Sequence, residues 1–266
     1  MPRSGVMDHF FGRKNIGLVT SRLTKGESFA HAQMTTGIVE VICMSPKTSN
    51  NGFVFPLWLF ASSQPKDLLN TVVPEQRPNL SPEFLAALTG AVGGTPAPED
   101  VLAWIYAVLY TPSYRARYAD FLKRDFPRIP LTRNRGLFDQ LVTIGHELIA
   151  LHTMDSVLPR ITTFDVAGSN EVEKVRYAPP EPAAGETGRI YINAAQYFGG
   201  VPQAVWDMHI GGYRVAEKWL KDRKGRLLSY DDITHYQAVI AALARTLELQ
   251  AALDDAVDAA GGWPLH

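Results

Sequence analysis

Two histidines and a glutamate stand close together in the run His146-Glu147-Leu-Ile-Ala-Leu-His152, which could suggest the helix of a zinc hydrolase. In that motif the histidine ligands are four residues apart, so both point to one side of the helix. Here they are six residues apart, which is about 240° around a helix. The position of the second ligand is Ala150, which cannot bind a metal. We therefore expect no metal site and no catalytic residues here.

Other common signatures of catalysis are also missing from the sequence. No glycine pair follows a strand in a G-x-G-x-x-G pattern, and there is neither a phosphate-binding loop ending in Gly-Lys-Ser/Thr nor a G-x-S-x-G nucleophile motif. The Asn/Asp-Pro-Pro-Tyr/Phe tetrapeptide of amino-methylating DNA methyltransferases is absent. The single cysteine, Cys43, permits neither an internal disulfide nor a cysteine-based zinc site. A stand-alone hydrolase or methyltransferase is therefore the weakest hypothesis.

Residues suited to binding phosphates and base edges lie in two turns near the N-terminus. Phosphate oxygens accept hydrogen bonds from Ser, Thr and Lys, whereas Arg and Asn can form bidentate bonds with guanine and adenine. A solvated polar turn is an equally open interpretation. The residues that we predict to bind DNA in these turns are Thr20, Ser21, Arg22, Lys25, Lys47, Thr48, Ser49, Asn50 and Asn51.

A second candidate is the cationic run Lys221-Asp-Arg-Lys-Gly-Arg226. Its cations Lys221, Arg223, Lys224 and Arg226 complete the predicted DNA-binding set. The alternative is that they only stabilise the C-terminus of a helix, where positive charge is favourable.

The formal net charge of -1 conceals strongly charged segments. Residues 1–51 carry net +3, residues 114–135 net +5 and residues 211–226 net +4, whereas residues 227–266 carry net -5. Such segregation can give a molecule one positive and one negative face. The DNA-binding hypothesis requires the three basic segments to fold onto a single surface.

The composition of the 266-residue chain, 46% hydrophobic and 20% charged, is that of an ordinary globular protein. Disordered and fibrous proteins are thereby excluded. The longest apolar run, Val101 to Tyr110, is about half the length of a bilayer span. Because residues 1–30 also lack a signal-peptide core, we expect a cytoplasmic protein with no membrane partner.

The elements that must position these residues alternate between strands and helices. Strands are predicted over residues 15–20, 37–44, 53–60, 172–177 and 189–193, and helices over 98–110, 114–123, 137–154 and 213–221. Asn51-Gly52 predicts a hairpin between the second and third strands, and Pro56 indicates an edge strand or a bulge. A short helix is predicted after Ser81-Pro82, and Ser229-Tyr-Asp-Asp232 resembles a capping box.

We predict the α+β fold class, with a small mixed or antiparallel sheet from the N-terminal third and the middle strands. This sheet packs with a larger helical body that ends in a long helix. The predicted parts are a β-rich recognition part (1–64), a Pro/Gly-rich connection (65–98) and a mainly helical part (99–266) with a β insertion near 165–200. Together they are expected to form one composite domain, which the resemblance described next implies is a target-recognition domain. The last helix carries a seam that packs on another helix, in this chain or in a neighbour: Ile233, Tyr236, Ile240, Leu243 and Leu247.

Several stretches, in the same order along the chain, resemble the C-terminal target-recognition (specificity) domain of type ISP restriction–modification enzymes. The resemblance runs from about residue 6 to residue 253. The matching stretches are Asn15-Ile-Gly-Leu-Val-Thr-Ser-Arg22, Lys47-Thr-Ser49, Phe55-Pro-Leu-Trp-Leu59, residues 106–115, 121–130 and 147–152, Gly211-Gly-Tyr-Arg-Val-Ala-Glu-Lys-Trp-Leu-Lys-Asp-Arg-Lys-Gly-Arg226, and Leu228-Ser-Tyr230.

The resemblance implies a domain that binds a short asymmetric site on double-stranded DNA and presents it to an N6-adenine methyltransferase. A nuclease and a helicase-like ATPase would precede it on the same polypeptide. S-adenosylmethionine, ATP and Mg are implied only for those upstream modules, and no cofactor is implied for this chain. Because those modules are not in this sequence, we expect a fragment or a truncated gene product. A helical coupling module of the same enzyme is the main alternative function.

Overall fold

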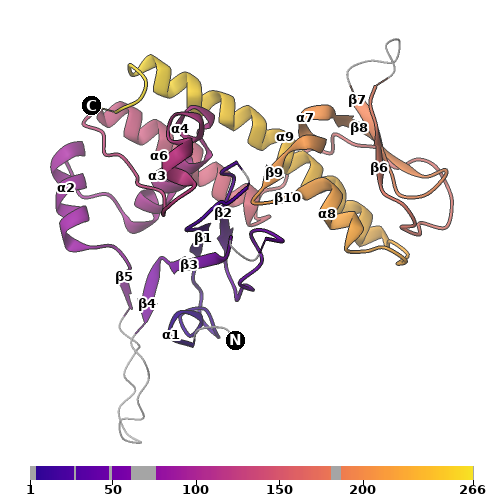
Figure 1. Ribbon diagram of the computed structural model, residues 1–266, viewed down its shortest axis with the longest axis horizontal. Helices are drawn as coiled ribbons and strands as arrows, with labels where there is room; N and C mark the ends of the chain where they lie inside the picture. The colour runs from indigo at the N-terminus through magenta and orange to yellow at the C-terminus, as the bar shows by residue number, and fades with distance from the viewer. Residues whose placement is uncertain (1–3, 27, 48–49, 61–75, 181–186, 266) are drawn as a thin grey trace, which may run out of the picture.

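The computed structural model describes residues 4–26, 28–47, 50–60, 76–180 and 187–265, and its fold class is α+β, as predicted. Figure 1 shows a body of helices crossed by the long α9 (Tyr230–Ala259), with small sheets around it. The other helices are α1 (Ser4–Met7), α2 (Pro82–Val92), α3 (Pro98–Tyr110), α4 (Pro112–Arg117), α5 (Ala119–Leu122), α6 (Arg135–His152), α7 (Gln203–Asp207) and α8 (Val215–Lys221). The strands are β1 (Gly17–Ser21), β2 (Ala32–Thr35), β3 (Gly52–Pro56), β4 (Trp58–Phe60), β5 (Gln76–Pro78), β6 (Arg176–Ala178), β7 (Thr187–Tyr191), β8 (Tyr197–Pro202), β9 (His209–Ile210) and β10 (Tyr213–Arg214).

The N-terminal sheet has the strand order β2-β1-β3 and is antiparallel. Pro56, which cannot donate a backbone hydrogen bond, lies on the edge strand β3, as predicted. The predicted strand over residues 37–44 and its hairpin with the third strand are wrong, because the described residues between β2 and β3, 36–47 and 50–51, contain no strand. Its β-branched residues Ile38, Val41 and Ile42 are exposed. A run of β-branched residues does not become a strand where no sheet edge and no core face receives it.

Local capping chemistry explains where the helices begin. Asp232 N donates to Ser229 Oγ and Ser229 N donates to Asp232 Oδ2, both at 3.1 Å, so the predicted capping box of α9 is confirmed. Ser81 caps α2 in a similar way by accepting from Phe84 N. The predicted helix 114–123 is instead divided at Tyr118 into α4 and α5. Among the described residues, no helix is both long and apolar enough to cross a membrane.

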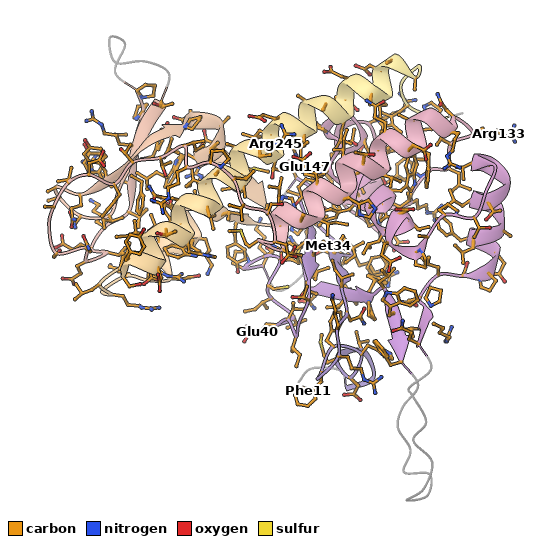
Figure 2. The ribbon with its side chains drawn as sticks, turned by 180° about the vertical axis from the view of Figure 1, so that it is seen from behind. Phe11, Met34, Glu40, Arg133, Glu147 and Arg245 are labelled. Atoms are coloured by element: carbon orange, nitrogen blue, oxygen red, sulfur yellow. The ribbon has the colours of Figure 1, made fainter. Side chains whose placement is uncertain are left out.

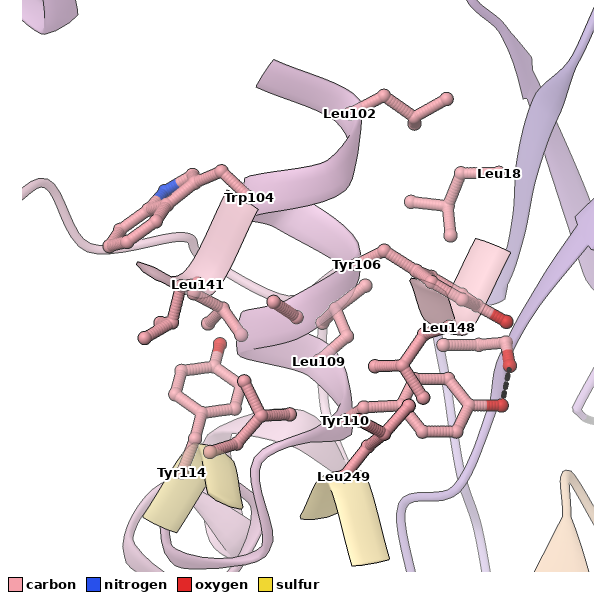
Figure 3. Close-up of a cluster of buried hydrophobic side chains, with 14 of the residues drawn as sticks. Leu18, Leu102, Trp104, Tyr106, Leu109, Tyr110, Tyr114, Leu141, Leu148 and Leu249 are labelled. Carbon is pink, nitrogen blue, oxygen red and sulfur yellow. Dashed lines mark hydrogen bonds between the residues drawn. The ribbon is translucent and has the colours of Figure 1, made fainter. Parts of the chain in front are cut away.

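Two hydrophobic cores lie side by side along α9. The first is formed by β1, β2, α2–α6 and the C-terminal half of α9, and Figure 3 shows its centre around Trp104, Tyr106 and Leu148. The second is formed by β6–β8, α7, α8 and the N-terminal half of α9. The predicted seam of α9 belongs to the second core, where Tyr236 and Ile240 are fully buried. The seam therefore packs within this chain and not on a neighbour.

The turn between β9 and β10 joins the second core to the N-terminal loops. Gly211 N donates to the carbonyl of Ala30 (2.7 Å), and Gly212 N donates to the carbonyl of Met44 (2.8 Å). These bonds explain why a glycine pair opens the string 211–226: the backbone of the turn lies directly against the loop 36–51. The junction fixes the N-terminal sheet relative to the second core.

Candidate nucleic-acid interface

The first predicted DNA-binding residues, Thr20 and Ser21, are buried at the end of β1. Thr20 Oγ1 donates to the carbonyl of His31 (2.6 Å), and Ser21 Oγ donates to the carbonyl of Asn50 (3.2 Å). Both hydroxyls thus tie the strand to neighbouring backbone and do not reach solvent. Their hydrogen bonds hold the backbone of the loops near the end of β1 in place.

Asn50 is also fully buried, and it clamps the two predicted turns together. Its Oδ1 accepts from Lys25 N (3.0 Å), and its Nδ2 donates to the Lys25 carbonyl (3.4 Å). Asn51 is half-buried, and Thr48 and Ser49 lie outside the described residues. The amide that the sequence suggested as a base reader therefore holds the loop backbone.

The three cations of these turns, Arg22, Lys25 and Lys47, do reach the surface. Lys47 Nζ donates to the carbonyl of Gly26 (2.6 Å), which draws the two turns together from the solvent side. The buried polar side chains thus hold the backbone of the turns, and the exposed cations give these turns a positively charged surface that can attract anions.

The second basic segment of the sequence folds against the first. Thr24 Oγ1 donates to the carbonyl of Leu122 (3.1 Å), and Arg22 Nε donates to Asp125 Oδ1 (3.1 Å). The exposed cations that follow α5 therefore lie beside those of the N-terminal turns. We call this surface the basic platform, and its members are Arg22, Lys25, Lys47, Lys123, Arg124 and Arg128.

The first two basic segments meet in this way, whereas the cationic turn at the end of the third has contacts of its own. The turn after α8 belongs to the second core, where Gly225 N donates to the carbonyl of Val172 (2.8 Å), and Figure 1 places it at the far end of α8 from the β9–β10 junction. Lys221 Nζ pairs with Glu217 Oε1 at 2.9 Å. Arg223 pairs with Asp232 and lies 3.5 Å above the Trp219 ring. Lys224 and Arg226 are exposed.

A second cationic surface was missed by the sequence reasoning. The strand registers place Arg176, Tyr191 and Tyr197 opposite one another on one face of the β6-β7-β8 sheet, with Arg189 two residues along. The Arg176 guanidinium lies 3.6 Å above the Tyr191 ring, and that of Arg189 lies 4.9 Å above the Tyr197 ring. The alternation in Arg189-x-Tyr191 is the only sequence signal of this face.

His146 and Glu147 have structural partners. Glu147 on α6 accepts two bonds from Arg245 on α9 (2.6 and 3.2 Å), and Figure 2 labels the two residues where these helices lie side by side. His146 Nε2 lies 2.8 Å from Asp100 Oδ1 on α3. In the described ranges, no group of three or more His, Cys, Asp or Glu side chains is placed to hold a metal ion. These contacts fit the expectation that this helix has a packing role.

The family described as the Type ISP C-terminal specificity domain matches residues 1–251 of the chain. The chain belongs to this family. A comparison with curated protein sequences gives no significant match.

Solved structures share the fold of this specificity domain. It is 19% identical to the ATP-dependent Type ISP restriction–modification enzyme LlaBIII bound to DNA, with a TM-score of 0.68 over 91% of this chain and 16% of that chain. The DrdV–DNA complex gives 18% identity and a TM-score of 0.72 over 94% of this chain and 25% of that chain. A nuclease-deletion mutant of the Type ISP enzyme LlaGI with a DNA substrate mimic gives 19% identity and a TM-score of 0.62 over 91% and 21%. The specificity domain thus spans a quarter or less of these chains.

His152 of the specificity domain is held neutral in a polar chain between α3, α6 and α9. Thr246 Oγ1 donates to the Ala242 carbonyl (2.7 Å), so it accepts from His152 Nε2 (2.9 Å). His152 Nδ1 then accepts from Tyr106 Oη (2.6 Å). Burial, and secondarily the nearby Arg115, lower the pKa of His152 from its ordinary value to about 3.

This neutral histidine makes the domain sensitive to acid. Between the folded pKa of about 3 and the unfolded value of about 6.5, the unfolded chain binds the extra proton, so stability falls as the pH is lowered. At pH 5 we expect a loss of about 2 kcal/mol from this residue, relative to pH 7, in urea unfolding. His152→Gln, which keeps a donor and an acceptor but does not titrate, should remove that part of the pH dependence. An unchanged pH dependence in the variant would contradict the neutral assignment.

Proposed function

We propose that this chain recognises a specific site on double-stranded DNA as the specificity domain of a type ISP restriction–modification enzyme. It presents the site to an N6-adenine methyltransferase and a translocase and nuclease carried elsewhere in that enzyme. The observation that carries the proposal is the basic platform, because two basic segments about a hundred residues apart in sequence meet on one surface. Family membership and the DNA-bound structures of the same fold support it.

In this proposal the platform residues contact different parts of the DNA. Lys25, Lys47, Arg124 and Arg128 neutralise phosphates, and Arg22 contacts a base edge. Thr20, Ser21 and Asn50 act below them by holding the loops in position, as their buried hydrogen bonds favour. Thr48, Ser49 and Asn51 are further DNA contacts in this proposal. Lys221, Arg223, Lys224 and Arg226 are outlying contacts to DNA beyond the site.

The chain carries no catalytic residue of its own in this proposal. S-adenosylmethionine, ATP and Mg serve the methyltransferase and the helicase-like module, and the whole enzyme works in the cytoplasm. Residues 1–64, 65–98 and 99–266 act as one composite target-recognition domain, because α9 packs in both cores. A role limited to coupling through the α9 seam is disfavoured, since that seam is buried within the chain.

Selection from random duplex DNA, followed by affinity measurements over a range of salt, tests the proposal. If about six phosphates are neutralised, the slope of log K against log salt should be near -5. Lys25→Ala and Lys47→Ala should each reduce that slope by about one and weaken binding to all sequences alike. Lys174→Ala, an exposed lysine beside the second core, is the matched control and should change little. Absence of any selected sequence, or salt-independent affinity, would contradict DNA recognition.

A further inference from the structure

Arg22, a member of the basic platform, forms an ion pair with Asp125. The pair joins the end of β1 to the segment after α5, across 103 residues of sequence, and uses Arg22 Nε and Asp125 Oδ1 at 3.1 Å. Among the described residues, neither terminal nitrogen of Arg22 has a hydrogen-bond partner, and its side chain is 60% exposed. The carboxylate thus holds the guanidinium by its inner edge and leaves the two outer nitrogens facing solvent.

The backbone that carries Asp125 is held in place by the packing of its neighbour in sequence. Phe126, the next residue, packs edge to face on Phe53 and Phe55 of β3, with ring centroids 5.1 and 5.5 Å apart. Thr24, two residues after Arg22, is bonded through its hydroxyl to the Leu122 carbonyl. Both members of the ion pair are therefore attached to the same framework, so the direction of the guanidinium is set before any ligand arrives.

A guanidinium held in this way is poorly suited to a phosphate contact. The adjacent carboxylate offsets its charge, and a phosphate brought to the outer edge would approach Asp125 as well. A purine edge differs, because recognition there depends on the direction of two donors. Two terminal arginine nitrogens match O6 and N7 of guanine in the major groove, and prior orientation reduces the conformational entropy lost on binding.

We propose that Asp125 is a positioning residue that aims Arg22 at a guanine of the recognised DNA site. This inference rests on the proposed function and adds the identity of one base. The carboxylate occupies Nε, and the terminal nitrogens donate to O6 and N7. The other platform cations remain sequence-independent contacts.

The test compares base preference in four variants, using the site selected by the unaltered chain. Arg22→Ala and Arg22→Lys should each relax the preference for guanine at one position by about tenfold, because neither keeps two fixed donors. Asp125→Asn should relax the preference at that same position by about three- to tenfold. Exposed ion pairs contribute little to stability, so these variants should fold. The matched control is Asp120→Asn, which removes a nearby exposed carboxylate paired with Lys123 and should leave every base preference unchanged.

Salt dependence separates positioning from simple charge removal. Arg22→Lys keeps the charge and Asp125→Asn removes a negative one, so neither should reduce the salt slope. The inference is overturned if Asp125→Asn leaves the preference intact, or relaxes a position other than the one read by Arg22, while the unaltered chain stays selective. If the unaltered chain selects no sequence, the proposed function itself fails.

Discussion

Gly211→Ala is expected to lower the free energy of unfolding by about 3 kcal/mol, the combined cost of a left-handed backbone and a steric clash. Gly211 has φ 60°, and a Cβ there would overlap the carbonyl oxygen of Met44. The backbone of Gly211 and the carbonyl of Met44 cannot move apart easily, because both belong to the hydrogen-bonded junction between the β9–β10 turn and the N-terminal loop. Chemical unfolding measures the loss. Protease cleavage within the loop 36–51 should also become faster.

Gly225→Ala is the matched control for the strain that a left-handed backbone conformation causes in alanine. Its φ is 76°, but no atom lies within 4 Å of the position of its Cβ. It should therefore cost only the strain of a left-handed residue, about 1 kcal/mol. Equal losses at the two positions would show that the contact with Met44 does not limit the junction.

Gly145→Ala should destabilise the first core by about 3 kcal/mol, although alanine is the better helix former. Gly145 lies in the middle of α6, where a Cβ would overlap the carbonyl oxygen of Ala103 on α3. The two helices approach closely only because this side chain is missing. Separating them would loosen the packing of Trp104, Leu141 and Leu148 around the crossing. Thermal and urea unfolding of the variant measure the loss.

The same substitution in an open helix should have the opposite sign. Gly90 lies within α2, with no atom within 4 Å of the position of its Cβ. Gly90→Ala should therefore stabilise the chain by about 0.5–1 kcal/mol through helix propensity. A stabilising Gly145→Ala would contradict the close approach of α3 and α6.

The features that the sequence predicted correctly depend on neighbouring residues. The capping box of Ser229 and Asp232, the Pro98 start of α3 and the apolar spacing along α9 are set within one or two helical turns. Pro56 on an edge strand is a consequence of its missing N–H.

Other features depend on segments that are distant in the sequence. Residues 37–44 have strand composition, but β1 pairs with β2 and β3, and residues 37–44 form no strand beside either of them. Asn50 has the chemistry of a base reader, yet it is buried against Lys25. The Lys221–Arg226 turn is basic, yet it packs beside Val172.

The sequence alone determined the fold class, the family and the presence of basic segments, because composition, periodicity and ordered motifs are properties of the chain itself. Only the tertiary structure decided which cations share a surface and which polar side chains lie beneath it. Arg22 and Asp125 are 103 residues apart, and no local pattern records that they meet. Their contact follows from how β1 and the segment after α5 pack on common neighbours, and packing is a property of the whole folded chain.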